Sequence, residues 1–170
     1  MEQCEVCRFE WDAIAADEMP VRLRVAAAGF AEALAAEGSS PYDRAGPQMW
    51  SAIEYAAHAR DVLLNLRERI ICGVAEDNPT PKAMFAAVRL AAGVYAGESV
   101  EALPAEMTVA TELLCRTLEA LTPEVLARPI FYPYPVPATR TLLWVGAQAV
   151  HEMEHHLDDV RTLMSADVVE

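Results

Sequence analysis

The stretch of sequence that decides the fold is TRTLLWVGAQAVHEMEHHLDDVRTLM, residues 139–164. Its apolar residues recur at helical spacing, which predicts a long helix that begins at Ala138 or Thr139 and ends near Met164. The apolar positions available for packing along it are Val145, Val150, Leu157, Val160 and Met164. Because a helix with one apolar face must bury that face against other elements, we expect this helix to lie in a bundle.

Four earlier segments also have the composition and end signals of helices. They cover residues 13–37, 48–72, 82–96 and 105–121. Residues 127–137 contain four prolines, whose missing N–H donors exclude a helix, so we expect an ordered loop there. No segment alternates apolar and polar residues as a strand would. The sequence predicts an all-α fold, a four-helix bundle with a short extra helix and a proline-rich loop before the last helix.

The size and charge of the chain limit the classes of protein that it can be. With 54% hydrophobic content, residues 1–170 fit a single helical domain, in which residues 1–12 form a Cys-x-x-Cys N-terminal segment. No long uncharged apolar run predicts a membrane span, and the first residues lack the order of a secretory signal, so we expect a cytoplasmic location. A net charge of -13 would repel a phosphate backbone, so nucleic acid is not an expected partner.

Histidines provide the strongest signal of function. The chain has four, and three of them fall within the string HEMEHH, residues 151–156. On a helix His151 and His155 lie one turn apart on the same face, so both imidazoles can reach one metal ion at roughly 2.0 to 2.1 Å. His156 points about 100° away and is not an expected ligand. His58 is the third expected ligand, because ions in bundle cores are held by side chains from facing helices.

Carboxylates near these histidines are the candidate catalytic groups. Glu54 and Asp61 lie one turn either side of His58, where they can orient its imidazole or accept a proton. Glu152 completes the pattern H-E-x-x-H, in which zinc proteases use the glutamate as general base. A protease is disfavoured, because only fifteen residues follow His155 and no edge strand is evident for a peptide. Alternatively, the histidines bind no metal ion: His58 is a core residue with satisfied hydrogen bonds, and the histidines of the last helix lie on a solvated face.

Two strings of the sequence resemble the DinB/YfiT-like superfamily of metal-dependent proteins. They are WSAIEYAAHARD, residues 50–61, and WVGAQAVHEMEHHLDDV, residues 144–160. The resemblance spans nearly the whole chain. It implies that His58, His151 and His155 bind a divalent ion such as zinc, nickel or iron, and that the protein is a homodimer.

The resemblance also implies a class of chemistry. Some members of this superfamily transfer low-molecular-weight thiols, among them mycothiol-dependent maleylpyruvate isomerases and bacillithiol or mycothiol S-transferases. Isomerase-like members have a glutamate in place of the first histidine of the last helix, so His151 argues against that subgroup.

Three imidazoles leave an open coordination position on a metal ion. We expect a small thiol such as mycothiol, or water, to bind there and attack a small electrophilic substrate, with Glu54, Asp61 or Glu152 as proton acceptor. Candidates for the mouth of the pocket are Tyr42, Trp50, Tyr132, Tyr134 and Arg140. The alternative is a non-catalytic metal-binding or stress-related bundle, in which the ion stabilises the fold.

Two cysteines near the N-terminus form a second candidate site. Cys4 and Cys7 have the C-x-x-C spacing of zinc ligands, but no second pair follows at the spacing of a zinc ribbon. They are interpreted as exposed thiols, as a dithiol redox pair, or as ligands of a second ion completed by Cys72, Cys115 or His156.

Overall fold

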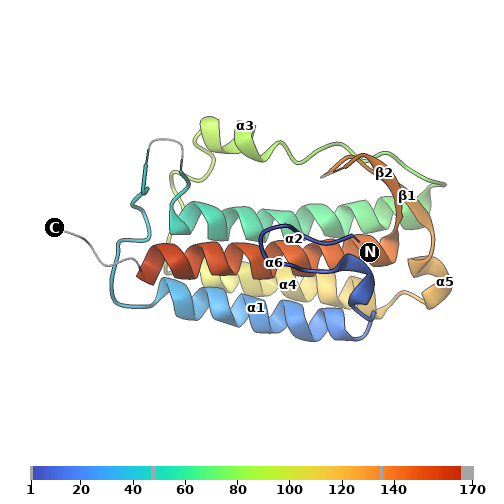
Figure 1. Ribbon diagram of the computed structural model, residues 1–170, viewed down its shortest axis with the longest axis horizontal. Coiled ribbons are helices and arrows are strands. Elements are labelled where there is room, and N and C mark those ends of the chain that lie inside the picture. Colours follow the sequence, from blue (N-terminus) through green and yellow to red (C-terminus); the bar gives the residue numbers. More distant parts are fainter. Residues whose placement is uncertain (1, 47–48, 135, 166–170) are drawn as a thin grey trace.

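The computed structural model of the protein describes residues 2–46, 49–134 and 136–165. Its four long helices are α1 (Glu18–Leu34), α2 (Ala52–Ala75), α4 (Leu103–Glu119) and α6 (Leu142–Ser165). They lie alongside one another as a bundle (Figure 1). Helix α6 packs between α1 and α2, and α4 contacts the same two helices. The prediction of an all-α four-helix bundle is therefore confirmed.

Short elements precede the first long helix or connect the later ones. They are η1 (Trp11–Ala13), α3 (Ala86–Ala91), α5 (Pro123–Leu126), β1 (Pro129–Tyr132) and β2 (Ala138–Thr141). The helix predicted over residues 82–96 was wrong in length, because only α3 forms within it. Phe85 before α3 and Gly93 after it both have left-handed φ angles, of 58° and 71°, which interrupt a helix on either side.

The proline-rich segment is a hairpin rather than a loop. Strands β1 and β2 pair antiparallel, with Pro129 opposite Thr141 and Tyr132 opposite Ala138. The expectation that the chain contains no strand was therefore wrong, as was the start of the last helix at residue 138 or 139. Proline is tolerated here because Pro129 occupies the first position of its strand.

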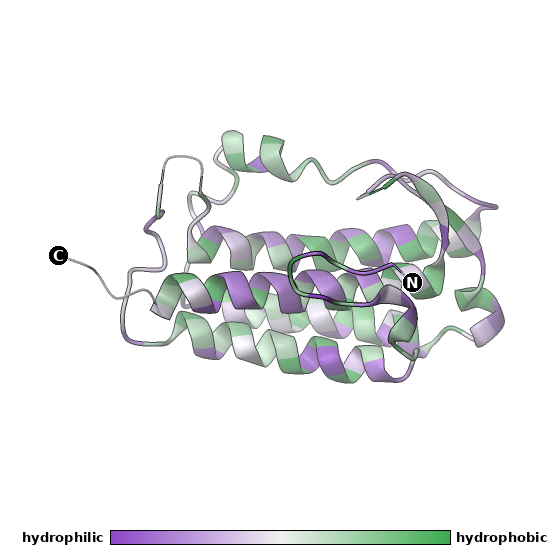
Figure 2. Cartoon of the chain, viewed as in Figure 1, coloured by the Kyte–Doolittle hydropathy of each residue, from purple (hydrophilic) through white to green (hydrophobic). Residues whose placement is uncertain are grey.

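Local signals in the sequence set the ends of the helices. Helix α2 begins with a capping box, in which Ser51 and Glu54 satisfy backbone groups of the first turn. Apolar residues of the long helices then fill the core, and the largest of these fully buried side chains include Phe30, Leu63 and Leu114. Figure 2 shows hydrophilic residues in the middle of α6, beside the N-terminal segment that crosses it. The polar part of α6 is thus covered by the first residues of the chain.

The long helices carry polar and charged residues along their length. Among the residues that the structure describes, no helix combines the length and the apolar character needed to cross a bilayer.

Close packing of α2 against the start of α6 depends on Gly73. A Cβ at this position would lie 2.2 Å from Cδ2 of Leu142, which is fully buried. We predict that Gly73→Ala lowers the free energy of unfolding by about 1–2 kcal/mol, since the cost of overpacking exceeds the gain in helix propensity. Urea denaturation measures the change. Gly97→Ala is the matched control, because a Cβ there meets no atom within 4 Å. Equal stability of the two variants would contradict this view of the contact.

Candidate metal centre

Helix α6 carries two pairs of metal-ligating residues on adjacent faces. His151 and His155 form one pair, and Glu152 and His156 form the other. Successive residues of a helix differ by about 100° in direction, so the two pairs meet different parts of the molecule. One pair faces α2, and the other faces the N-terminal segment.

The first group joins His58 of α2 to Glu152 and His156 of α6. One donor atom from each lies within 4.8 Å of the others. Nε2 of His58 is 4.0 Å from Oε2 of Glu152, and Nε2 of His156 is 3.3 Å from the same oxygen. Nδ1 of His58 is buried and has no hydrogen-bond partner among the described residues. Two imidazoles and a carboxylate therefore converge from two helices.

Neighbouring polar groups hold the α6 members of this group in place. Nδ1 of His156 lies 2.9 Å from Oδ2 of Asp159. Gln148 donates from Nε2 to Oε1 of Glu152 at 2.6 Å, and its own Oε1 accepts from Nε1 of Trp11 at 2.6 Å. Such partners fix the ring orientation and tautomer of metal-binding residues. Trp11 thus connects the N-terminal segment to Glu152 through one side chain.

The charges of the first group depend on burial and on hydrogen bonds. Burial, and then the charge of His156, lower the pKa of His58 to about 4. Burial opposes protonation of His156, but its hydrogen bonds to Asp159 and Glu152 raise its pKa to about 9. Burial likewise opposes ionisation of Glu152, yet the hydrogen bond with His156 lowers the pKa of this carboxyl. The favoured state is an imidazolium beside a carboxylate, so a metal ion would release a proton from His156 on binding.

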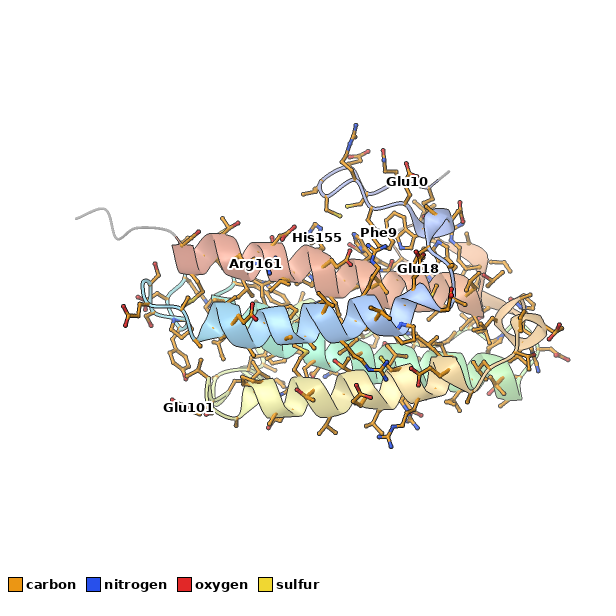
Figure 3. The ribbon with its side chains drawn as sticks, turned by 90° about the horizontal axis from the view of Figure 1, so that it is seen from below. Phe9, Glu10, Glu18, Glu101, His155 and Arg161 are labelled. Atoms are coloured by element: carbon orange, nitrogen blue, oxygen red, sulfur yellow. The ribbon has the colours of Figure 1, made fainter. Side chains whose placement is uncertain are left out.

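The second group lies on the other face of α6 and joins both ends of the chain. Its donor atoms also all lie within 4.8 Å of one another, and its members are Cys4, Cys7, His151 and His155. Figure 3 shows Phe9 and His155 on the side of α6 that faces the N-terminal segment. The ring of His151 packs against Phe9 and Trp11, with centroids 5.4 and 4.7 Å apart. A third combination, His155 with His156 and Asp159, shares His155 with this group and His156 with the first group.

The structure thus divides the expected three-histidine set. His58 falls in the first group, whereas His151 and His155 fall in the second. The residue that α6 directs toward His58 is His156, which the sequence analysis set aside. The signal that could have found it is Glu152, which has the same four-residue spacing to His156 that His151 has to His155.

The other candidates have different partners. Glu54 accepts a hydrogen bond from the backbone N of Ser51 at 2.9 Å and forms an ion pair with Arg44. Asp61 forms ion pairs with Arg60 and Arg89, at 2.9 and 2.6 Å. Within the described residues, the groups of potential metal ligands contain neither Cys72 nor Cys115. Tyr42 accepts from the backbone N of Val100, and Arg140 pairs with Glu2.

A cavity of about 410 Å³ opens beside the first group. Its lining includes the three residues of that group, together with Trp50, Tyr55, Val62, Asn65, Leu66, Arg69, Met84, Phe85, Tyr132, Tyr134 and Gln148. Its size and mostly aromatic and apolar walls are typical of pockets for small molecules. Of the described residues that line it, none belongs to the second group. The first group is therefore accessible to a ligand.

The comparisons place this chain in a known family. Residues 17–160 match the DinB superfamily, and the chain belongs to it. Its fold is similar to that of YfiT from Bacillus subtilis, described as a probable metal-dependent hydrolase with an unusual four-helix bundle topology. The TM-score is 0.78, with 16% identity over 89% of both chains. No curated protein matches the chain in sequence.

A mycothiol-dependent maleylpyruvate isomerase has a similar fold as well. The TM-score is 0.69 with 12% identity, over 94% of this chain and 63% of the isomerase. A mutant of a mycothiol-dependent maleylpyruvate isomerase gives a TM-score of 0.70 with 11% identity, over the same shares of the two chains. At these identities the likeness concerns the fold.

The side chain of Gln148 generates a prediction about stability. It is 1% exposed, and Gln148→Leu would leave the buried N–H of Trp11 and an oxygen of Glu152 without their hydrogen bonds. We expect the free energy of unfolding to fall by about 1–3 kcal/mol, as for other unpaired buried groups. Urea denaturation of chelator-treated protein, followed by circular dichroism, measures it. Gln3→Leu is the control, since the hydrogen bonds of Gln3 are exposed. A stability like that of the wild type would refute this role of Gln148.

Proposed function

We propose that the protein is a metal-dependent enzyme that transfers a small thiol to an electrophilic small molecule at His58, Glu152 and His156. The observation that carries the proposal is the convergence of these three donors beside a pocket of about 410 Å³. This set replaces the three histidines expected from the sequence, because His156 and Glu152, rather than His151 and His155, share a group with His58.

The residues present fit a catalytic metal ion. Three protein ligands leave a coordination position for a substrate, and two imidazoles with one carboxylate suit zinc, nickel or iron. Asp159 and Gln148 provide the hydrogen bonds that orient His156 and Glu152. A bound divalent cation lowers the pKa of a thiol or water that it binds, so that the ionised nucleophile exists near neutral pH.

Glu152 is assigned here as a ligand rather than as a general base. Its two oxygens already face Gln148 and His156. Glu54 and Asp61 are not assigned to proton transfer, because each forms ion pairs with arginines. The work of this chain at the site is to bind the ion, orient the nucleophile and exclude water with aromatic side chains.

The shape of the pocket favours a reaction of two molecules. Its walls follow α2 from His58 to Arg69, a distance of about 16 Å along a helix axis. Arg69 is 6% exposed and lies over the ring of Tyr132, 4.8 Å from its centroid. No carboxylate of residues 2–46, 49–134 and 136–165 forms an ion pair with Arg69. Its guanidinium donates from one Nη to the carbonyl of Lys82 at 3.0 Å, and its other N–H groups, at the wall of the pocket, can bind an anionic group on the thiol or on the electrophile.

The comparisons support thiol chemistry and leave a second candidate. One structure of similar fold is named as mycothiol-dependent, which favours a thiol, and another as a probable hydrolase, which favours water. The proposed ligand set contains a glutamate, as the isomerase-like members of the family do. His151, on which the expectation against that subgroup rested, lies in the other group. We propose mycothiol or a related thiol as co-substrate.

The proposal predicts a metal-dependent conjugation reaction. Zinc- or nickel-loaded protein should join mycothiol, bacillithiol or glutathione to monochlorobimane, as measured by fluorescence. His58→Ala should remain folded by circular dichroism and lose this activity, because one of three ligands is missing. If no thiol is conjugated while p-nitrophenyl acetate is hydrolysed with metal dependence, the protein is a hydrolase. A large drop in melting temperature of His58→Ala without activity in the wild type indicates a non-catalytic metal-binding bundle.

Asp159 gives a test of how the site is oriented. Asp159→Ala removes the acceptor for Nδ1 of His156, so the zinc concentration for half-maximal conjugation should rise by about 10–100-fold. Asp158→Ala is the matched control, since this neighbouring carboxylate is 72% exposed and faces Arg161. An equal shift in both variants would indicate a general effect of charge and contradict an orienting role.

A further inference from the structure

We propose that Cys4, Cys7, His151 and His155 bind one zinc ion in a closed tetrahedral site that fastens the N-terminal segment to α6. This site is separate from the proposed catalytic group of His58, Glu152 and His156. It does not depend on the function proposed for that group.

The positions of the donors fit this ion. The four donor atoms lie within 4.8 Å of one another. In a tetrahedron with zinc–sulfur bonds near 2.3 Å and zinc–nitrogen bonds near 2.0 Å, the donors are separated by roughly 3.3 to 3.8 Å. Small movements of four side chains therefore close the site. Two cysteines and two histidines are among the usual ligand sets of structural zinc.

The backbone of the N-terminal segment is shaped around the two cysteines. Backbone N of Arg8 donates to the carbonyl of Cys4 at 3.0 Å, and backbone N of Cys4 donates to the carbonyl of Phe9 at 2.9 Å. Arg8 has a left-handed φ of 64°. A non-glycine residue in this region costs about 1–3 kcal/mol, which the surrounding structure must offset. The strained turn directs both sulfurs to the same two histidines.

Three ring nitrogens of these histidines have no hydrogen-bond partner among the described residues. His151 is 9% exposed. Neither of its ring nitrogens has a hydrogen bond within the described parts of the chain. The same holds for Nδ1 of His155. A neutral imidazole has one donor and one acceptor, and burying either unpaired costs about 1–3 kcal/mol. A metal ion satisfies the acceptor, whereas a disulfide between the cysteines would leave both rings unpaired.

The chemistry of this set differs from that of the first group. Four protein ligands fill the coordination of zinc, which is typical of structural sites, while catalytic sites keep one position open. Two thiols lose their protons on binding, and the two thiolates neutralise the charge of Zn²⁺. None of the four ligands belongs to the described lining of the cavity. The ion therefore holds the chain together and does not meet substrate.

The site also supports Trp11. This residue lies four positions after Cys7, and its indole stacks on Trp144 with centroids 5.9 Å apart. Its N–H is the donor to Gln148, which in turn donates to Glu152. Fastening the N-terminal segment therefore keeps this series of hydrogen bonds in place.

Cobalt substitution tests the site without any activity assay. Full-length protein purified under reducing conditions, stripped by chelator and loaded with Co²⁺, should show sulfur-to-cobalt charge-transfer absorption and the intense visible bands of tetrahedral cobalt. Cys4→Ser and Cys7→Ser should weaken or remove the charge-transfer band and lose about one zinc equivalent per chain in elemental analysis. His155→Ala should weaken the charge-transfer absorption and remove the visible bands that arise from this site, while any bands of cobalt bound to His58, Glu152 and His156 remain.

The controls separate this site from the first group. Cys72→Ser should keep the full spectrum, because Cys72 belongs to neither group. Glu152→Gln should also keep the charge-transfer band, since the first group contains no sulfur. The band and the zinc equivalent therefore persist even if the proposed enzyme activity fails. A wild-type protein without sulfur-to-cobalt absorption overturns the site, as does a zinc content that is the same in Cys4→Ser and Cys72→Ser.

Discussion

Burial of polar side chains on α6 is the constraint on which the rest of the structure depends. Gln148 and His151 are 1% and 9% exposed, on a helix whose other buried residues are apolar. Each buried polar atom without a partner costs about 1–3 kcal/mol, so the neighbouring elements must supply partners. The N-terminal segment supplies Trp11 for Gln148, and α6 itself supplies Asp159 for His156. On α6, the buried side-chain atoms without a hydrogen bond among the described residues belong to His151 and His155, the α6 members of the second group.

Half-exposed ion pairs contribute less to the stability of the bundle. Arg22 binds both oxygens of Glu154 at 2.7 and 2.6 Å and so joins α1 to α6. The two side chains are 40% and 36% exposed, and pairs of this kind are worth about 0–1 kcal/mol. The apolar core, with residues such as Phe30 and Leu63 at 1% and 0% exposure, therefore holds the helices together. The buried polar groups are therefore not needed to hold the helices together and can act as ligands.

The sequence predicted the parts of this fold that depend on long periodic patterns. Helices α1, α2, α4 and α6 were found because each has many apolar residues at helical spacing. The hairpin of β1 and β2 was missed, because its strands have four residues each and are defined by pairing with each other. Helix α3 was predicted too long, since the left-handed conformation of Phe85 arises from tertiary context and not from any residue signal.

The grouping of the histidines could not be predicted from the sequence. His58, His151 and His155 were expected to bind one ion, and His156 was set aside, although a shift of one residue along a helix turns the side chain by only about 100°. Which face of α6 meets α2 depends on the packing of the whole bundle. Cys4 and Cys7 could not be paired with His151 and His155 from spacing, because about 145 residues separate them and no local pattern links them.

Placing two groups within six residues of one helix couples their geometry. His151 and Glu152 are consecutive, so any rotation of α6 about its axis moves both, in the same sense, relative to their partners on the N-terminal segment and on α2. Ligand atoms must be held to within a few tenths of an ångström for metal binding. A helix fixed on one side by a closed site therefore has little freedom to rotate on the other. By restricting the rotation of α6, the proposed structural ion also fixes the orientation of His156 and Glu152, which line the pocket.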